Sequence, residues 1–120
     1  MKILLDTNIL IAGFVGRGSC YELIINAAGI HHIYYTDYII NEFQKVLRKK
    51  FGFQEKLVHE FAGMIKNAFK KGKTAIQVPA VCRDVDDNQI LADALENGVD
   101  VIITGDLDLL NRKGYQGIKI

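Results

Sequence analysis

Some carboxylates of this chain stand beside strongly apolar segments. Asp6 directly follows the apolar stretch 3–5 and is followed in turn by the apolar run 9–11. A charge in a dry protein interior costs several kcal/mol unless it is paired or neutralised. We therefore expect the Asp6 carboxylate either to have a buried partner or to lie in an open site.

Acids fall at comparable positions in three further segments. Asp106 follows the apolar stretch 101–104 after a single glycine, and Asp108 comes two residues later. Asp87 begins a segment with helical apolar spacing, and Glu42 stands at the border of the apolar face of another helix. We therefore expect four separate segments to bring carboxylates to one cleft.

Converging carboxylates would require a cation. Four of them at interior dielectric repel one another strongly, and their pKa values rise unless a positive ion lies among them. Carboxylate oxygens are hard ligands, which favours Mg²⁺ or Mn²⁺. Zinc is not favoured, because His31 and His32 are adjacent, His59 stands alone, and the cysteines form no cluster with them.

Each acid also has a structural explanation. Asp87 and Asp106 could each cap the N-terminus of a helix, and Glu42 could be an ordinary residue at the edge of an amphipathic face. The other acids of segment 83–93 are expected to be solvated rather than catalytic: Asp84, Asp86 and Asp93. Asp6 is the hardest to explain structurally, since both of its flanks are apolar.

The elements that would position these acids alternate along the chain. Strands are expected at residues 2–5, 32–36, 74–78 and 101–104, with an edge strand at 118–120. Helices are expected at residues 8–15, 19–28, 37–51, 54–71, 87–97 and 106–112. The pattern predicts a three-layer α/β/α fold, with a mostly parallel sheet of about five strands, in a single domain over 1–120. Ligands of such sheets bind beyond the carboxyl ends of the strands, where Asp6 and Asp106 fall.

Basic residues are concentrated in the middle of the chain. Residues 45–73 contain nine Lys and Arg against two acids, a net charge of +7. The rest of the chain contains six basic and twelve acidic residues, a net charge of −6. Such a stretch is either a solvated pair of lysine-rich helices or a surface that follows phosphates near an acidic site.

The sequence carries no signal of a membrane or of an oxidising compartment. No apolar run approaches the roughly 18 residues that span a bilayer, and Asp6 interrupts the only candidate core of a signal peptide. Cys20 and Cys82 are far apart in the sequence, and we expect them to be reduced thiols. The chain is therefore expected to be cytoplasmic and to have no membrane partner.

Four motifs together resemble one known family. LLDTNILI at 4–11, NEF at 41–43, DVDDNQILADAL at 84–95 and TGDLDLL at 104–110 are similar to the motifs of the PIN domain family (PilT N-terminus). They follow the family order over essentially the whole chain. The similarity is closest to the small prokaryotic members, which include VapC-type toxins.

The resemblance gives each matched residue an expected role. The acidic quartet of the family corresponds to Asp6, Glu42, Asp87 and Asp106, with Asp108 as an alternate fourth metal ligand. Thr7, Asn8 and Thr104 occupy supporting positions. Asp84 and Asp86 make the third motif ambiguous, and Asp87 is preferred because it directly precedes the NQILADAL segment.

The resemblance implies a Mg²⁺- or Mn²⁺-dependent endoribonuclease, the toxin of a toxin–antitoxin system. One or two ions held by the four acids would activate a water for in-line attack on a phosphodiester and would stabilise the charge that develops on oxygen. The residues expected to hold the RNA backbone are Lys45, Arg48, Lys49 and Lys50. Family members often form homodimers, and many VapC-type toxins bind an antitoxin protein that covers the acidic site.

Three other interpretations remain open. A receiver domain also binds Mg²⁺ at strand ends, but it needs an acid pair at the first strand and a lysine where Gly105 follows Thr104. A haloacid dehalogenase-like phosphatase needs Asp-x-Asp after the first strand, and Asn8 occupies the second acid position. A catalytically inactive PIN scaffold that binds only RNA or a protein partner is the main alternative.

Overall fold

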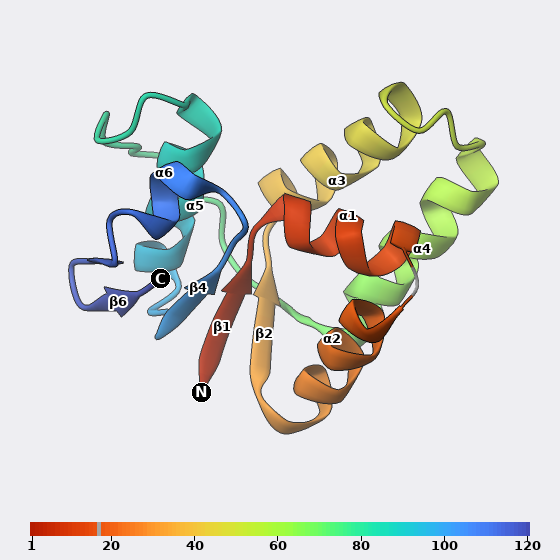
Figure 1. The fold of residues 1–120 in the computed structure, drawn as a ribbon, viewed down its shortest axis with the longest axis horizontal. Coiled ribbons are helices and arrows are strands. Elements are labelled where there is room, and N and C mark those ends of the chain that lie inside the picture. Colours follow the sequence, from red (N-terminus) through yellow and green to blue (C-terminus); the bar gives the residue numbers. More distant parts are fainter. Residues whose placement is uncertain (17) are drawn as a thin grey trace.

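Strands and helices alternate along the chain, as predicted. The computed structural model describes residues 1–16 and 18–120. The strands of this part of the chain are β1 (Lys2–Leu5), β2 (His32–Tyr35), β3 (Lys70–Lys71), β4 (Val101–Ile103), β5 (Gly114–Tyr115) and β6 (Ile118–Lys119). Its helices are α1 (Thr7–Gly16), α2 (Ser19–Ile30), α3 (Asp37–Lys49), α4 (Glu55–Ala68), α5 (Val85–Glu96) and α6 (Leu107–Leu110). Figure 1 shows β1, β2 and β4 between the helices.

The strands of the described residues form one sheet, in the order β3-β2-β1-β4-β6-β5. All neighbouring pairs are parallel except β5 and β6, so the sheet is mostly parallel and has one strand more than expected. Leu4 of the central strand β1 is in register with Tyr34 of β2 and with Ile102 of β4. Because these three strands run the same way, the residues that follow them meet at one edge of the sheet.

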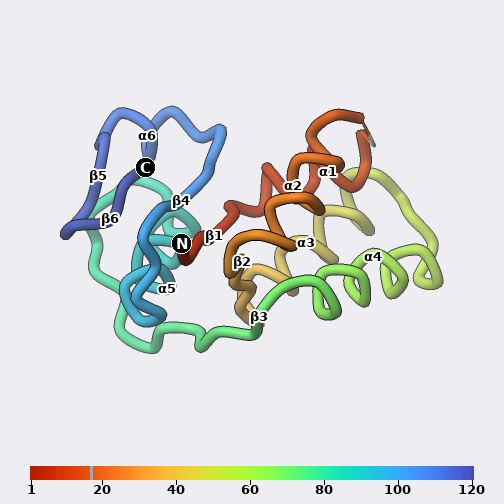
Figure 2. Tube along the Cα trace, turned by 90° about the horizontal axis from the view of Figure 1, so that it is seen from below, coloured from red at the N-terminus to blue at the C-terminus, as the bar shows by residue number. Residues whose placement is uncertain are grey.

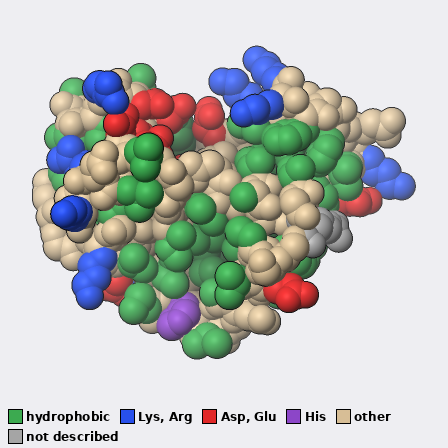
Figure 3. Space-filling model, in the orientation of Figure 1, with side chains coloured by type: hydrophobic (Ala, Val, Ile, Leu, Met, Phe, Trp, Pro, Cys, Tyr) green, Lys and Arg blue, Asp and Glu red, His purple; other side chains and the backbone are tan. Residues whose placement is uncertain are grey.

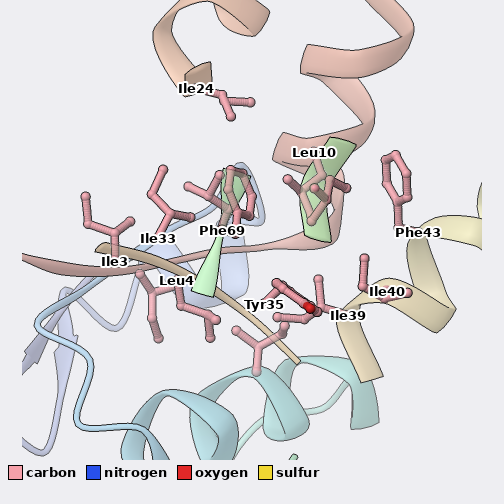
Figure 4. Close-up of a cluster of buried hydrophobic side chains, with 14 of the residues drawn as sticks. Ile3, Leu4, Leu10, Ile24, Ile33, Tyr35, Ile39, Ile40, Phe43 and Phe69 are labelled. Atoms are coloured by element: carbon pink, nitrogen blue, oxygen red, sulfur yellow. The ribbon is translucent and has the colours of Figure 1, made fainter. Parts of the chain in front are cut away.

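Helices cover both faces of the sheet, which confirms the predicted layers. The buried side chains of Ile3 and Ile33 lie on the same face as Ile24 of α2, whereas Leu4 lies on the opposite face, toward α5 (Figure 4). Helices α3 and α4 run side by side next to the sheet (Figure 2). Burial on both faces explains why β1 is continuously apolar from Ile3 to Leu5 rather than alternating.

A cluster of aromatic rings joins the helices α1 to α4. Phe14 of α1 is fully buried. Its ring centroid lies 5.4 Å from that of Tyr21 in α2 and 5.7 Å from those of Phe43 in α3 and Phe61 in α4. One side chain of α1 therefore contacts each of the three helices that follow it.

The strand predicted at 74–78 is wrong. Instead, the two-residue strand β3 pairs with β2, and the chain after it is irregular. Side chains of α5 bind the backbone there: Asp93 accepts a hydrogen bond from the Ala75 N–H at 2.7 Å, and Gln89 donates to the Ala75 carbonyl at 3.0 Å. These side chains supply the partners that a strand ladder would otherwise provide.

The expectation that Asp93 is solvated is also wrong. Its side chain is fully buried. Asp93 accepts hydrogen bonds from the Thr36 hydroxyl and the Gln89 amide, both at 2.8 Å. Burial raises the pKa of Asp93, and these hydrogen bonds oppose the rise. Thr36 is the N-cap of α3, because its hydroxyl accepts from the Ile39 N–H. Asp93 therefore joins α5 to the start of α3 inside the protein.

The ends of all six helices differ from the predictions by up to three residues, and α4, α5 and α6 show the clearest cases. The helix predicted at 87–97 begins at Val85, since the Asp84 side chain accepts from the Asp86 N–H at 2.9 Å and caps it. The helix predicted at 54–71 ends at Ala68, and the one predicted at 106–112 ends at Leu110.

The helices of the described residues are short. No single one combines the length and the apolar composition needed to cross a membrane. Helices α1 and α2 meet that test only when taken together, and they are bent by 117° to one another.

Candidate metal centre

A cleft of about 290 Å³ opens at the carboxyl ends of β1 and β4. Six acids from four segments line it: Asp6, Glu42, Asp84, Asp86, Asp87 and Asp106. Figure 3 shows acidic side chains gathered at the top of the molecule, with basic side chains across a hollow from them, over α3. The fold thus brings the four acids expected from the sequence to one place.

Asp6 lies directly after β1 and is buried. Its Oδ2 accepts a hydrogen bond from the Thr104 hydroxyl at 2.7 Å, and its Oδ1 accepts one from the Thr7 N–H at 2.7 Å. Burial raises the pKa of Asp6, the two hydrogen bonds lower it, and the nearby Asp106 raises it further. The Asp6 side chain is therefore held in one orientation by neutral donors and has no cation of the described chain as a partner.

Thr104 positions two acids at once. While its hydroxyl donates to Asp6, the same oxygen accepts from the Asp106 N–H at 3.0 Å. Asp106 caps the short helix α6 by accepting from the Asp108 N–H at 2.8 Å, so the capping explanation holds for this residue. Asn8 lines the cleft and accepts from the Gly105 N–H at 3.4 Å. The supporting positions expected from the sequence thus contact the acids or the turn that carries them.

Asp87 has a buried oxygen without a donor. It lies in the first turn of α5 and is 4% exposed, and within the described residues its Oδ2 has no hydrogen-bond partner. The capping explanation fails for Asp87, because Asp84 caps this helix. Burial, and then repulsion from Asp106, Asp84 and Asp6, raise the pKa of Asp87 to about 6. A buried carboxylate oxygen that lacks a donor fits the role of a cation ligand.

Asp108 lies beside the cleft and has a cationic partner. One oxygen each of Asp87, Asp106 and Asp108 lie within 4.8 Å of one another. Both oxygens of Asp108 accept from Nη2 of Arg83, at 2.8 and 3.1 Å. Asp108 is not among the described residues that line the cleft. The alternate fourth ligand is therefore ion-paired, whereas Asp106 forms no ion pair with any residue that the structure describes.

The basic residues of segment 45–50, which covers the end of α3 and its C-cap Lys50, do not all line the cleft. Lys50 lines it. Lys45 lies 3.9 Å from the half-buried Glu42, and the Arg48 side chain is paired with Glu55 at 2.6 Å. Lys49 is exposed. Of these four candidates for RNA binding, Lys50 is the one that reaches the cleft in the described structure.

Tyr38 is a cleft residue that the sequence patterns did not single out. Its hydroxyl donates to Asp86, and both residues line the cleft. Burial and the hydrogen bond to Asp86 raise the pKa of Tyr38. Tyr38 lies four residues before Glu42 on α3, so the two share a helix face, and this spacing could have identified it.

The raised pKa of Asp87 predicts that the protein without metal ions loses stability as the pH rises. A carboxyl whose pKa is about 6 when folded, against an ordinary value of 3.8, binds a proton more strongly in the folded state. Its stabilisation is present below about pH 4 and is lost as the pH passes about 6. In EDTA, we expect the melting temperature to fall between about pH 4 and 7, and to fall less in Asp87→Asn. Equal slopes in the two proteins, measured by thermal unfolding, would contradict this assignment.

Comparison with known proteins places the fold. A family model described as PIN domain matches residues 2–108. No curated protein matches the chain significantly. A chain in the crystal structure of VapBC2 from Rickettsia felis, bound to a DNA fragment from their promoter, superposes with a TM-score of 0.72. The sequence identity is 12%, and the match covers 99% of this chain and 96% of that chain. At this sequence identity, the comparison shows that the two chains share a fold and nothing more.

Proposed function

The chain belongs to the PIN domain family, and from that premise we propose that it is a metal-dependent endoribonuclease and the toxin of a toxin–antitoxin pair. PIN domains are generally nucleases and typically use divalent metal ions. The observation that carries the proposal is the buried Asp87 oxygen without a donor, in a cleft that Asp6, Glu42 and Asp106 also line. Acids so placed repel one another unless a cation neutralises them.

The ion that we propose is Mg²⁺ or Mn²⁺. Asp6, Glu42, Asp87 and Asp106 would hold it, because their oxygens are the hard ligands that both ions prefer. When bound, the ion would lower the pKa of a water and stabilise the negative charge that develops on the phosphodiester oxygens. Thr104 and the Thr7 backbone keep the Asp6 carboxylate oriented. The described lining of the cleft contains no Ser, Cys or His that could replace water as the nucleophile.

The direct test is cleavage of total cellular RNA by the purified protein. Parallel reactions contain Mn²⁺, Mg²⁺ or EDTA, and products are resolved on a denaturing gel. We expect cleavage with either metal ion and none in EDTA. A protein that binds Mn²⁺ but cleaves no RNA would support the inactive PIN scaffold instead. Cleavage that continues in EDTA would contradict the metal-dependent mechanism.

Basic residues at the end of α3 are proposed to hold the RNA backbone. Lys50 lines the cleft, and Lys49, its neighbour in the sequence, is exposed. Each lysine–phosphate contact with a single strand contributes about 0.7 to the slope of log K against log salt. We therefore expect Lys49→Ala/Lys50→Ala to weaken RNA binding and to make the slope shallower by about 1.4. Fluorescence anisotropy of labelled RNA in EDTA measures both quantities.

The matched control for this prediction removes two lysines from α4. Lys56→Ala/Lys66→Ala changes the net charge equally, but neither residue lines the cleft. We expect it to leave the salt dependence of RNA binding nearly unchanged. If both pairs of substitutions reduce the slope alike, RNA binding depends on the general charge of 45–73 rather than on the end of α3.

We further propose an antitoxin partner and a homodimer. The antitoxin is suggested by the similar fold found in the VapBC2 structure.

We also propose that residues 1–120 form a single domain, which is supported by one hydrophobic cluster that extends from Ile3 to Ile118. A cytoplasmic location is consistent with the free thiols of Cys20 and Cys82. Light scattering of the purified chain, alone and with a co-expressed neighbouring gene product, tests the proposed homodimer and the proposed complex with an antitoxin.

A further inference from the structure

Arg83 is the cationic partner of the acidic cluster. Its Nη2 donates to both oxygens of Asp108, and its charge also interacts with Asp106. In the part of the chain that the structure describes, no other lysine or arginine forms an ion pair with Asp87, Asp106 or Asp108. The positive charge at this cluster therefore comes from one side chain of the loop before α5.

The acids form two overlapping groups. The cleft is lined by Asp6, Asp87 and Asp106, and the second group consists of Asp87, Asp106 and Asp108. Asp87 and Asp106 belong to both, so cations could lie on either side of them. Two adjacent ions of this kind are the arrangement of two-metal nucleases. On the side of the Asp87–Asp106 pair where Asp108 lies, the guanidinium of Arg83 contacts Asp108.

We propose that Arg83 supplies the second positive charge of this centre. The chain then binds one divalent ion in the cleft and none beside Asp108. The contact of Arg83 with both oxygens neutralises Asp108 and removes it from the set of metal ligands, which leaves Asp106 as the fourth ligand. This inference rests on the proposed function, because it assumes that a divalent ion binds in the cleft.

Mn²⁺ titration calorimetry of the purified chain tests this inference without measuring activity. We expect the unmodified protein to bind one equivalent of Mn²⁺. Arg83→Gln is expected to bind two equivalents, because Asp108 is then left without its counter-charge beside two other acids. Arg83→Gln/Asp108→Asn should return to one equivalent, and Arg83→Lys, which keeps the charge, should remain at one.

Arg112→Gln is the matched control. Arg112 donates to the Val81 carbonyl at 3.3 Å and lies over the ring of Tyr115, so it is near the same loop but forms no ion pair with the acids of the cluster. This variant should still bind one equivalent of Mn²⁺. Circular dichroism and the melting temperature establish that each variant is folded.

Two results would overturn the role of Arg83: two equivalents bound by the unmodified protein, or one equivalent bound by Arg83→Gln. The variant Asp87→Asn distinguishes a failure of the inference about Arg83 from a failure of the proposed function. If Asp87→Asn abolishes Mn²⁺ binding while Arg83→Gln changes nothing, only the inference about Arg83 is wrong. If Asp87→Asn leaves Mn²⁺ binding intact, the metal centre itself is wrongly placed.

Discussion

Asp6→Asn is expected to reduce RNA cleavage in Mn²⁺ by at least about a hundredfold, since loss of a residue that merely supports a metal ligand already costs about 10- to 100-fold. The amide is nearly the same size as the carboxylate but lacks its negative charge. Because Asp6 is buried among other acids, its replacement by a neutral group should leave the metal-free protein at least as stable. Initial cleavage rates and the melting temperature in EDTA measure the two effects.

Two further variants test whether the loss of cleavage is specific to the Asp6 site. Thr104→Val removes the hydroxyl that joins Asp6 to the Asp106 backbone and should reduce cleavage by about 10- to 100-fold. Asp100→Asn is the control, because Asp100 accepts from the Lys2 N–H at the opposite end of β1. It should cleave RNA at the unmodified rate. An Asp6→Asn protein that retains metal-dependent cleavage would refute the assignment of Asp6 as a ligand.

Phe14→Ala is expected to lower the free energy of unfolding by about 3 to 5 kcal/mol. Its ring is fully buried against Tyr21, Phe43 and Phe61, so the substitution leaves a cavity among four helices that cannot close without moving them. For a chain of this length the loss is a large part of the total stability. Urea unfolding followed by circular dichroism measures it.

Phe51→Ala is the matched control for Phe14→Ala. The Phe51 side chain is 41% exposed, and its ring has Phe53 as its aromatic neighbour at 6.0 Å. Its loss should cost about 1 to 2 kcal/mol, less than the loss of Phe14, because its ring is only partly buried. Similar costs for the two substitutions would show that the interior around Phe14 rearranges to fill the space.

The predicted fold succeeded where apolar segments decide the structure, and failed where buried polar groups do. Strands β1 and β4 were predicted because each contains a short apolar run, and β2 because its residues are β-branched and aromatic. The segment 74–78 was predicted as a strand on similar grounds, but its backbone is bound by Asp93 and Gln89 of α5. A single sequence gives no sign that a distant carboxylate will bind a particular N–H, so this strand could not be rejected.

The sequence allowed us to predict which acids lie together in the candidate site. It did not allow us to predict the hydrogen bonds and ion pairs of each acid. Asp6 and Asp106 follow neighbouring parallel strands, and topology alone brings them together. The pairing of Asp108 with Arg83 is a matter of side-chain reach across a loop, which spacing does not encode. Tyr38 was overlooked because an aromatic residue on an amphipathic helix is usually part of the core.

The buried contact between Asp93 and Thr36 has a consequence for thermal inactivation. It joins α5, which carries Asp87, to the beginning of α3, which carries Glu42. The two walls of the cleft are therefore linked inside the protein, and we expect them to separate only when the interior unfolds. An enzyme whose walls were joined only by surface loops would lose its activity by local opening, well below its unfolding temperature. In this chain, heating should remove the working cleft and the folded state together.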